Sequence, residues 1–130
     1  MKFIERSLGK FTTEIYSLMR IIIAVLYGSH GVQKLFGALG GHVAHSPKLI
    51  IAGIIEFTAG ILIGIGFKTR IAAFIASGEM AVAYFTVHYP GGFWPIMNGG
   101  EKAVFYCFVF LFMAFYGSGS WSVDSLLKRK

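Results

Sequence analysis

The segment "GIIEFTAGILIGIGFKTRIAA", residues 53–73, decides the fold. It is almost continuously apolar up to the polar run "KTR" at residues 68–70, and it becomes apolar again at Ile71. Apolar runs on both sides of such a break predict membrane-spanning helices, and the break itself leaves room only for a tight turn. We therefore expect two antiparallel helices joined at a membrane surface, with Glu56 inside the first of them.

The composition of the whole chain is typical of membrane proteins. Of its 130 residues, 55% are hydrophobic and 14% are charged, whereas soluble domains are about 25% charged. The mean hydropathy is +0.67. Glycine, which is frequent in membrane helices, occurs 17 times. The formal net charge of +6 comes from bases that flank the apolar runs, so membrane topology accounts for it and nucleic acid is not expected as a partner.

Four apolar blocks, each close to the ~20 residues that cross a hydrocarbon core, predict four membrane-spanning helices. We expect them at about 18–36, 48–67, 71–88 and 99–116. Ser46 and Pro47 are residue types that begin a helix, and Asn98 with Glu101 is typical of a capping box before the fourth helix. No internal repeat divides the chain. The predicted architecture is a single all-α membrane domain over residues 1–130, a four-transmembrane-helix bundle.

Lysine and arginine are distributed unequally between the two ends of the predicted helices. One side carries Lys2, Arg6, Lys10, Arg20, Lys68, Arg70, Lys128, Arg129 and Lys130, and the other carries Lys34, Lys48 and Lys102. Because basic residues accumulate on the cytoplasmic side, we expect both termini in the cytoplasm and the loops 37–47 and 89–100 outside. Apolar residues between bases over residues 3–15 are typical of a short helix on the inner membrane surface, or else of a frayed tail around Gly9.

Two carboxylates fall inside the apolar blocks. Glu56 and Glu79 would each cost roughly 2.5–3.5 kcal/mol near the centre of a lipid-exposed helix, so they should face protein. Both lie on stripes of small residues with helical spacing, the faces along which membrane helices approach closely. The stripes are Gly53, Gly60 and Gly64 around Glu56, and Ala72, Ala76 and Ala83 around Glu79. We expect these two stripes to form the contact between the second and third helices.

A polar turn at the end of the first helix indicates a site. His30, Gln33 and Lys34 follow the i, i+3, i+4 spacing of one helix face. Glu56, about two turns into a helix that runs the opposite way, reaches a similar depth, where Lys34 can neutralise it. The expected outcome is a buried polar cavity that opens outward, lined by His30, Gln33, Lys34, Glu56, Glu79, His88 and Glu101. The alternative is that such intramembrane ion pairs only fix the register of the helices.

The sequence contains no strong signature of a metal centre or of a catalytic group. His42 and His45 are typical of solvated loop residues, and a haem held between His30 and His88 has no supporting motif. Cys107 lacks a basic neighbour that would activate its thiol, so packing is its expected role. We expect no bound metal, and the sequence identifies no catalytic residue.

Five stretches, in their order and spacing, resemble the DoxX family of small bacterial membrane proteins. They are "RIIIAVLYGSHGVQKLFG", "GIIEFTAGILIGIGFKTRIAA", "HYPGGFW", "NGGEKA" and "GSGSWSVDSLL", and they extend from about Arg20 to Leu127. The resemblance implies four helices in the bacterial inner membrane. It also implies a quinone-linked redox role, through the small membrane subunit of an archaeal thiosulfate:quinone oxidoreductase. The matching motif residues are His30, Lys34, Gly37, Glu56, His88, Pro90, Asn98, Gly99, Gly100 and Glu101.

Three functions of different classes fit the sequence. The first is a redox subunit that binds a quinone head group in the cavity, with His30, Lys34 and the glutamates as hydrogen-bonding and proton-relay groups and a partner subunit as the source of electrons. The second is a small transporter, working as a homo-oligomer, in which Glu56 and Glu79 bind a proton or a cation. The third is a structural partner that holds other membrane proteins together.

Overall fold

The computed structural model describes residues 1–129, and within these residues the only regular structure is helical. The elements are α1 (Lys2–Gly9), α2 (Thr12–Phe36), α3 (Pro47–Ile65), α4 (Thr69–Ala83), the π-helix η1 (Tyr84–His88), the 3₁₀-helix η2 (Tyr89–Gly91), α5 (Pro95–Asn98), α6 (Glu101–Tyr116) and α7 (Val123–Lys128). Three segments are long and apolar enough to cross a membrane, namely Thr12–Phe36, Pro47–Ile65 and Thr69–Gly91. α6 has 16 residues, a length of about 24 Å at the helical rise of about 1.5 Å per residue.

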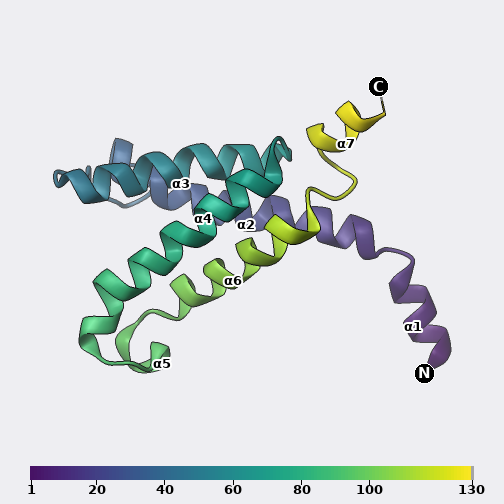
Figure 1. Cartoon of the computed structure of the whole chain (residues 1–130), viewed down its shortest axis with the longest axis horizontal. Helices are drawn as coiled ribbons and strands as arrows, with labels where there is room; N and C mark the ends of the chain where they lie inside the picture. The colour runs from purple at the N-terminus through teal and green to yellow at the C-terminus, as the bar shows by residue number, and fades with distance from the viewer. Residues whose placement is uncertain (130) are drawn as a thin grey trace.

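Two pairs of helices make up the body of the molecule (Figure 1). α2 and α3 lie side by side and antiparallel, and α4 and α6 form a second antiparallel pair. The pairs meet beside the turn between α3 and α4 and diverge from it, so that together they form a wedge. α1 points away from the start of α2, and α5 lies at the far tip of the α4–α6 pair. The turn predicted at "KTR" therefore joins the two pairs, because α3 belongs to one and α4 to the other.

Glycine brings the backbones of α2 and α3 into contact. A Cβ atom on Gly31 of α2 would lie 2.5 Å from the backbone nitrogen of Phe57 and 2.8 Å from the carbonyl oxygen of Gly53. A Cβ atom on Gly60 of α3 would lie 2.8 Å from Cα of Gly28. The prediction that the glycine stripe of α3 contacts the third spanning helix is therefore wrong. The stripe contacts α2 because Gly28 and Gly31 offer a matching surface without side chains, which permits a closer approach.

The alanine stripe of α4 packs chiefly along α6, which corrects the other half of the same prediction. Ala72 and Ala76 are buried in one core with Phe110 of α6. The Ser77 hydroxyl donates a hydrogen bond to the carbonyl oxygen of Cys107 at 2.7 Å. Large side chains of α6 thus fill the space that the small side chains of α4 leave, and Cys107 lies half-buried within this contact.

The start of α3 is as predicted, whereas the start of α6 is not. Ser46 Oγ accepts a hydrogen bond from the backbone nitrogen of Leu49 at 3.3 Å, with Pro47 in the first turn. This confirms the predicted cap. α6 begins at Glu101 after Gly100 and has no side-chain cap, so the predicted capping box is wrong.

Asn98 holds the preceding loop instead of capping α6. Its Nδ2 donates to the carbonyl oxygen of Gly92 at 2.8 Å and to the Tyr84 hydroxyl at 3.2 Å, and its Oδ1 accepts from the Gly100 nitrogen at 2.8 Å. Asn98 is the last residue of α5, and Gly99 turns the chain there with a φ of 76°. This turn directs the Asn98 side chain toward η1, which fastens the loop to the end of α4.

The N-terminal segment is helical, which decides between the two interpretations of residues 3–15. α1 ends at Gly9, and α2 begins at Thr12 and not near residue 18. None of the α1 side chains is buried. The apolar pattern of residues 3–15 therefore belongs to two helices that meet at a bend, and its second part extends the first spanning helix.

Arg20 is completely buried, although its place in the sequence predicts a base at the membrane surface. Its Nε donates to the carbonyl oxygen of Ile63 at 2.9 Å, and its terminal nitrogens donate to the carbonyl oxygens of Ser118 and Trp121. Carbonyl groups at the C-terminal end of a helix lack partners within it and carry partial negative charge, so they suit a guanidinium. Arg20 thereby ties α2 and the end of α3 to the segment that follows α6.

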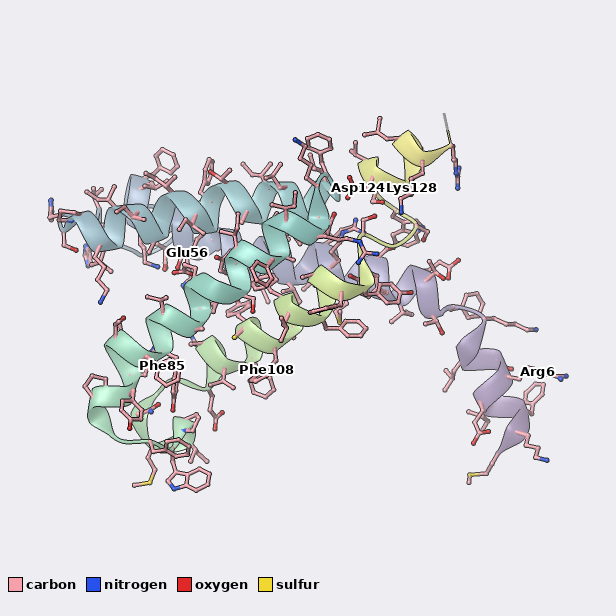
Figure 2. All side chains as sticks on the ribbon, viewed as in Figure 1. Arg6, Glu56, Phe85, Phe108, Asp124 and Lys128 are labelled. Carbon is pink, nitrogen blue, oxygen red and sulfur yellow. The ribbon has the colours of Figure 1, made fainter. Side chains whose placement is uncertain are left out.

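A carboxylate beyond α6 caps the N-terminus of α4. Asp124, in the first turn of α7 (Figure 2), accepts hydrogen bonds from the backbone nitrogens of Lys68 at 2.9 Å and Thr69 at 3.0 Å. Its own nitrogen donates to the carbonyl oxygen of Gly66 at 2.9 Å. Gly66 ends α3 with a φ of 72°, and a Cβ atom there would lie 2.3 Å from Cβ of Ser122. Glycine is therefore required on both conformational and steric grounds.

We expect Asp124→Asn to lower stability at neutral pH but not in acid. Burial raises the pKa of Asp124, but the backbone N–H groups of Thr69 and Lys68 outweigh it and hold the pKa below its usual value. A lowered pKa contributes stability above the unfolded value of about 3.9, and this contribution is lost as the pH falls through the folded pKa. Asparagine retains only one of the two acceptor oxygens and no charge, so thermal unfolding in detergent should give a difference of about 1 kcal/mol at neutral pH that vanishes in acid. A difference that is independent of pH would contradict the cap.

Candidate functional site

A cavity of about 890 Å³ lies between the two helix pairs, in the half of the wedge away from the α3–α4 turn. Its walls come from α2, α3, α4, η1 and α6. Isoleucine and valine side chains of α3, α4 and η1 supply much of the surface. The polar lining consists of His30, Lys34, Lys48, Glu56, Glu79, Thr86, His88, Lys102 and Tyr106. The cavity thus combines a lipid-like wall with a few groups that can form hydrogen bonds or carry charge, as binding sites for small molecules do.

Lys34 and Glu56 form an ion pair across the contact between α2 and α3. The Lys34 Nζ atom lies 2.7 Å from Oε2 and 3.0 Å from Oε1 of Glu56. The Glu56 side chain is 3% exposed and the Lys34 side chain 26%, so the carboxylate is enclosed while the lysine reaches the cavity. Figure 2 shows Glu56 pointing from α3 toward the space between α3 and α4. The pair depends on close helices, since a Cβ atom on Gly53 would lie only 2.9 Å from Cβ of Lys34.

Tyr27 of α2 holds the second carboxylate. Its hydroxyl donates to Oε2 of Glu79 at 3.1 Å. Its side chain is completely buried and packs against Tyr106 of α6, with ring centroids 5.7 Å apart. One side chain therefore links α2, α4 and α6 beside the cavity. We refer to the three ionisable residues that line the cavity here, Lys34, Glu56 and Glu79, as the floor cluster.

The two predicted histidines line the cavity from different elements. His30 of α2 lies edge-to-face with the Tyr106 ring, with centroids 6.3 Å apart. His88 ends η1, and its Nδ1 lies 3.3 Å from the carbonyl oxygen of Asn98. Within residues 1–129, histidine, cysteine, aspartate and glutamate form no group of three or more that could hold a metal ion. Hydrogen bonding and proton exchange are the chemistry that this set of side chains can provide.

Gln33 and Glu101 do not line the cavity, contrary to the expectation from the sequence. Gln33 Nε2 donates to the carbonyl oxygen of Leu39 at 2.9 Å and so closes the loop after α2. At about 100° per residue, Gln33 lies about 60° from His30 around the helix, which turns it toward that loop. Glu101 is exposed at the start of α6, and the next residue, Lys102, lines the cavity in its place.

Four polar lining residues were not among the predicted candidates, namely Lys48, Thr86, Lys102 and Tyr106. Lys48 and Lys102 entered the sequence argument only as bases that set topology. Tyr106 follows Lys102 by four residues, so the two share one face of α6. This spacing could have placed Tyr106 in the cavity if Lys102 and not Glu101 had been assigned to it.

The chain is similar to known proteins over the helices that build the cavity. The DoxX family model matches residues 15–89, which include His30, Lys34, Glu56, Glu79 and His88. An uncharacterized protein of Haemophilus influenzae is 39% identical over 132 aligned residues, which cover 95% of this chain and 98% of that protein. No solved structure matches the chain. The family match covers more than half of the chain and the relative nearly all of it, so the chain belongs to the DoxX family of membrane proteins.

Proposed function

We propose that this DoxX protein binds the head group of a quinone in the cavity and acts as the quinone-binding membrane subunit of a redox system. The observation that supports it most is an apolar wall, which suits lipid-soluble molecules, next to the floor cluster of Lys34, Glu56 and Glu79. A quinone head group has carbonyl oxygens that accept hydrogen bonds, and it takes up protons on reduction. Lys34, His30 and Tyr106 offer donors, and the carboxylates can exchange protons.

The proposal includes four membrane-spanning helices in the inner membrane of a bacterial cell, with α6 as the fourth. α6 runs antiparallel to α4 and is almost wholly apolar beyond its first two residues. Lys68 and Arg70 flank the α3–α4 turn, so the positive-inside rule favours this turn, and the termini on the same side, in the cytoplasm. The cavity then lies in the outer half of the membrane.

In this proposal the protein binds and orients the head group and moves protons, and a partner subunit supplies the electrons. Reduction of a quinone to a quinol takes up two electrons and two protons. Glu56 is tied to Lys34 by two hydrogen bonds, whereas Glu79 has one, from the Tyr27 hydroxyl. Glu79 is therefore the carboxylate that is freer to pass a proton.

We expect Gly78→Phe to weaken quinone binding without unfolding the protein. Gly78 lines the cavity, and a Cβ atom there meets nothing within 4 Å, so an aromatic ring can enter the cavity without displacing a helix. In calorimetric titrations the purified wild-type protein should bind a short-chain quinone, and Gly78→Phe should bind it more weakly by roughly tenfold or more, a loss of at least about 1.4 kcal/mol.

The matched control is Gly9→Phe, because Gly9 of α1 is equally open and lies outside the cavity. This variant should bind the quinone as the wild type does, and both variants should melt near the wild-type temperature. If the wild type does not bind the quinone, or if Gly78→Phe binds it equally well, the cavity is not the site that we propose.

A second candidate function, proton- or cation-coupled transport, is favoured by one observation. Glu56 and Glu79 come from different helices and line one cavity. A flux of protons or cations into liposomes that depends on Glu79, together with absence of quinone binding, would replace the redox proposal with this one.

A further inference from the structure

We infer that the cavity selects an acidic amphiphile, a lipid-soluble molecule with a negatively charged head group, through Lys48 and Lys102 at its mouth. The inference rests on the proposed function, because it takes the cavity as the binding site of a membrane-dissolved molecule. It narrows the ligand to a substrate class, a quinone whose head group carries an acidic group.

The three lysines on the side of the molecule that is predicted to face outward all line the cavity. They are Lys34, Lys48 and Lys102. Lys34 is neutralised by Glu56. Within residues 1–129, neither Lys48 nor Lys102 has a carboxylate within ion-pair distance. Both side chains are exposed, so the cavity has the Lys34–Glu56 pair and the Glu79 carboxyl group at its floor and two lysines without an ion-pair partner at its mouth.

The surrounding sequence offers almost no carboxylate that could pair with these two lysines. Residues 35–55 and 80–100 contain neither aspartate nor glutamate. Glu101 is exposed and does not line the cavity, although it precedes Lys102. The counter-charge for the rim is therefore missing from the chain around the mouth.

The two lysines also do not stabilise the helices in which they lie. Lys48 lies in the first turn of α3, and Lys102 lies in the first turn of α6. Positive charge in the first turn opposes the helix dipole, so each lysine is mildly unfavourable for its own helix. A negative group between them would be attracted by both side chains and by both helix ends.

The apolar wall of the cavity fits the alkyl chain of such a ligand. Ile51 and Ile55 of α3 face the cavity, and so do Ile75 and Val82 of α4. An alkyl chain along these side chains loses water-exposed area and remains in contact with lipid-like groups. The head group then lies between the floor cluster and the two rim lysines.

A matched pair of ligands tests this inference. The probes are an alkyl naphthoquinone and its ring-hydroxylated analogue, whose acidic hydroxyl is ionised at neutral pH. We expect the wild-type protein in detergent to bind the anionic analogue about tenfold more tightly than the neutral one, and the preference to fall as salt is added. The double variant Lys48→Gln/Lys102→Gln should lose the preference and keep its affinity for the neutral quinone.

The control is Lys2→Gln, on the exposed α1 helix, which should retain the full preference. Equal affinity of the wild type for the two quinones would overturn the inference and leave the proposed quinone site intact. A preference that survives in the double variant would overturn the assignment to Lys48 and Lys102. If neither quinone binds to the wild type, the proposed function fails and this inference fails with it.

Discussion

Replacing Gly31 with alanine is expected to lower the free energy of unfolding by about 3 kcal/mol, although it adds only one methyl group. That methyl would lie 2.5 Å from the Phe57 nitrogen, 2.9 Å from the Phe57 Cα and 2.8 Å from the Gly53 carbonyl oxygen. These atoms belong to the backbone of α3, so no side chain can rotate to make room. The helices α2 and α3 must separate, and the hydrogen bonds between Lys34 and Glu56 must lengthen with them.

The matched control is Gly64→Ala in the same helix contact. A Cβ atom on Gly64 would lie 3.5 Å from Cβ of Ala24, which is an ordinary van der Waals distance. We expect this variant to stay within about 0.5 kcal/mol of the wild type. Unfolding of both variants by a denaturing detergent, followed by circular dichroism, compares them directly. Similar losses for the two would mean that α2 and α3 do not approach as closely as the structure has them.

The features that sequence could predict are those that depend on local pattern. The apolar runs, the turn after α3 and the cap at Ser46 follow from hydropathy and residue type within a few positions. The Lys34–Glu56 pair follows from depth along two antiparallel helices. In each case the residue pattern of a helix or turn, or the depth of a residue along its helix, is sufficient, and the arrangement of the two helix pairs is not needed.

The choice of partner for each helix face could not be predicted. The glycines of α3 indicate a face that permits close approach, but they do not say which helix occupies it. Gly28 and Gly31 of α2 form the complementary surface, and they lie beside the polar turn of His30, Gln33 and Lys34 that the sequence pattern assigns to the site. α4 has bulkier alanines and is matched by the large side chains of α6.

Contacts between residues that are far apart in the sequence could not be predicted either. Arg20 donates hydrogen bonds to the carbonyl oxygens of Ser118 and Trp121, about one hundred residues later, whereas the sequence pattern alone predicts a surface base. Gln33 and Asn98 were assigned to the cavity and to a helix cap, but loops that the sequence leaves undefined take up their hydrogen bonds. A polar side chain near a helix end can either line a cavity or form hydrogen bonds with a loop, and the conformation of the loop determines which of the two occurs.

Lys34→Met is expected to destabilise the protein by about 3 kcal/mol, because it leaves the Glu56 carboxylate enclosed without its partner. Only 3% of the Glu56 side chain is exposed, and its two oxygens accept hydrogen bonds from the Lys34 ammonium group at 2.7 and 3.0 Å. Lys48→Met is the control, since Lys48 is exposed and has no such partner within residues 1–129. Its stability should change by less than about 0.5 kcal/mol.

Adding Glu56→Gln to Lys34→Met should restore part of the lost stability, because a neutral amide is less costly to enclose than an unpaired carboxylate. Binding of the short-chain quinone should not return with the stability, since the floor cluster would have lost two of its three ionisable groups. Recovery of stability without recovery of binding would distinguish a site from a contact that serves packing alone.

The coupling free energy between Lys34 and Glu56, from a double-mutant cycle in detergent unfolding, tests the central claim most directly. The claim is that the two residues act as one buried unit at the floor of a cavity. We predict a coupling of more than about 1 kcal/mol, with the double variant more stable than Lys34→Met alone. Additive effects, with a coupling near zero, would contradict the claim and would mean that Lys34 extends to the membrane surface as an anchor.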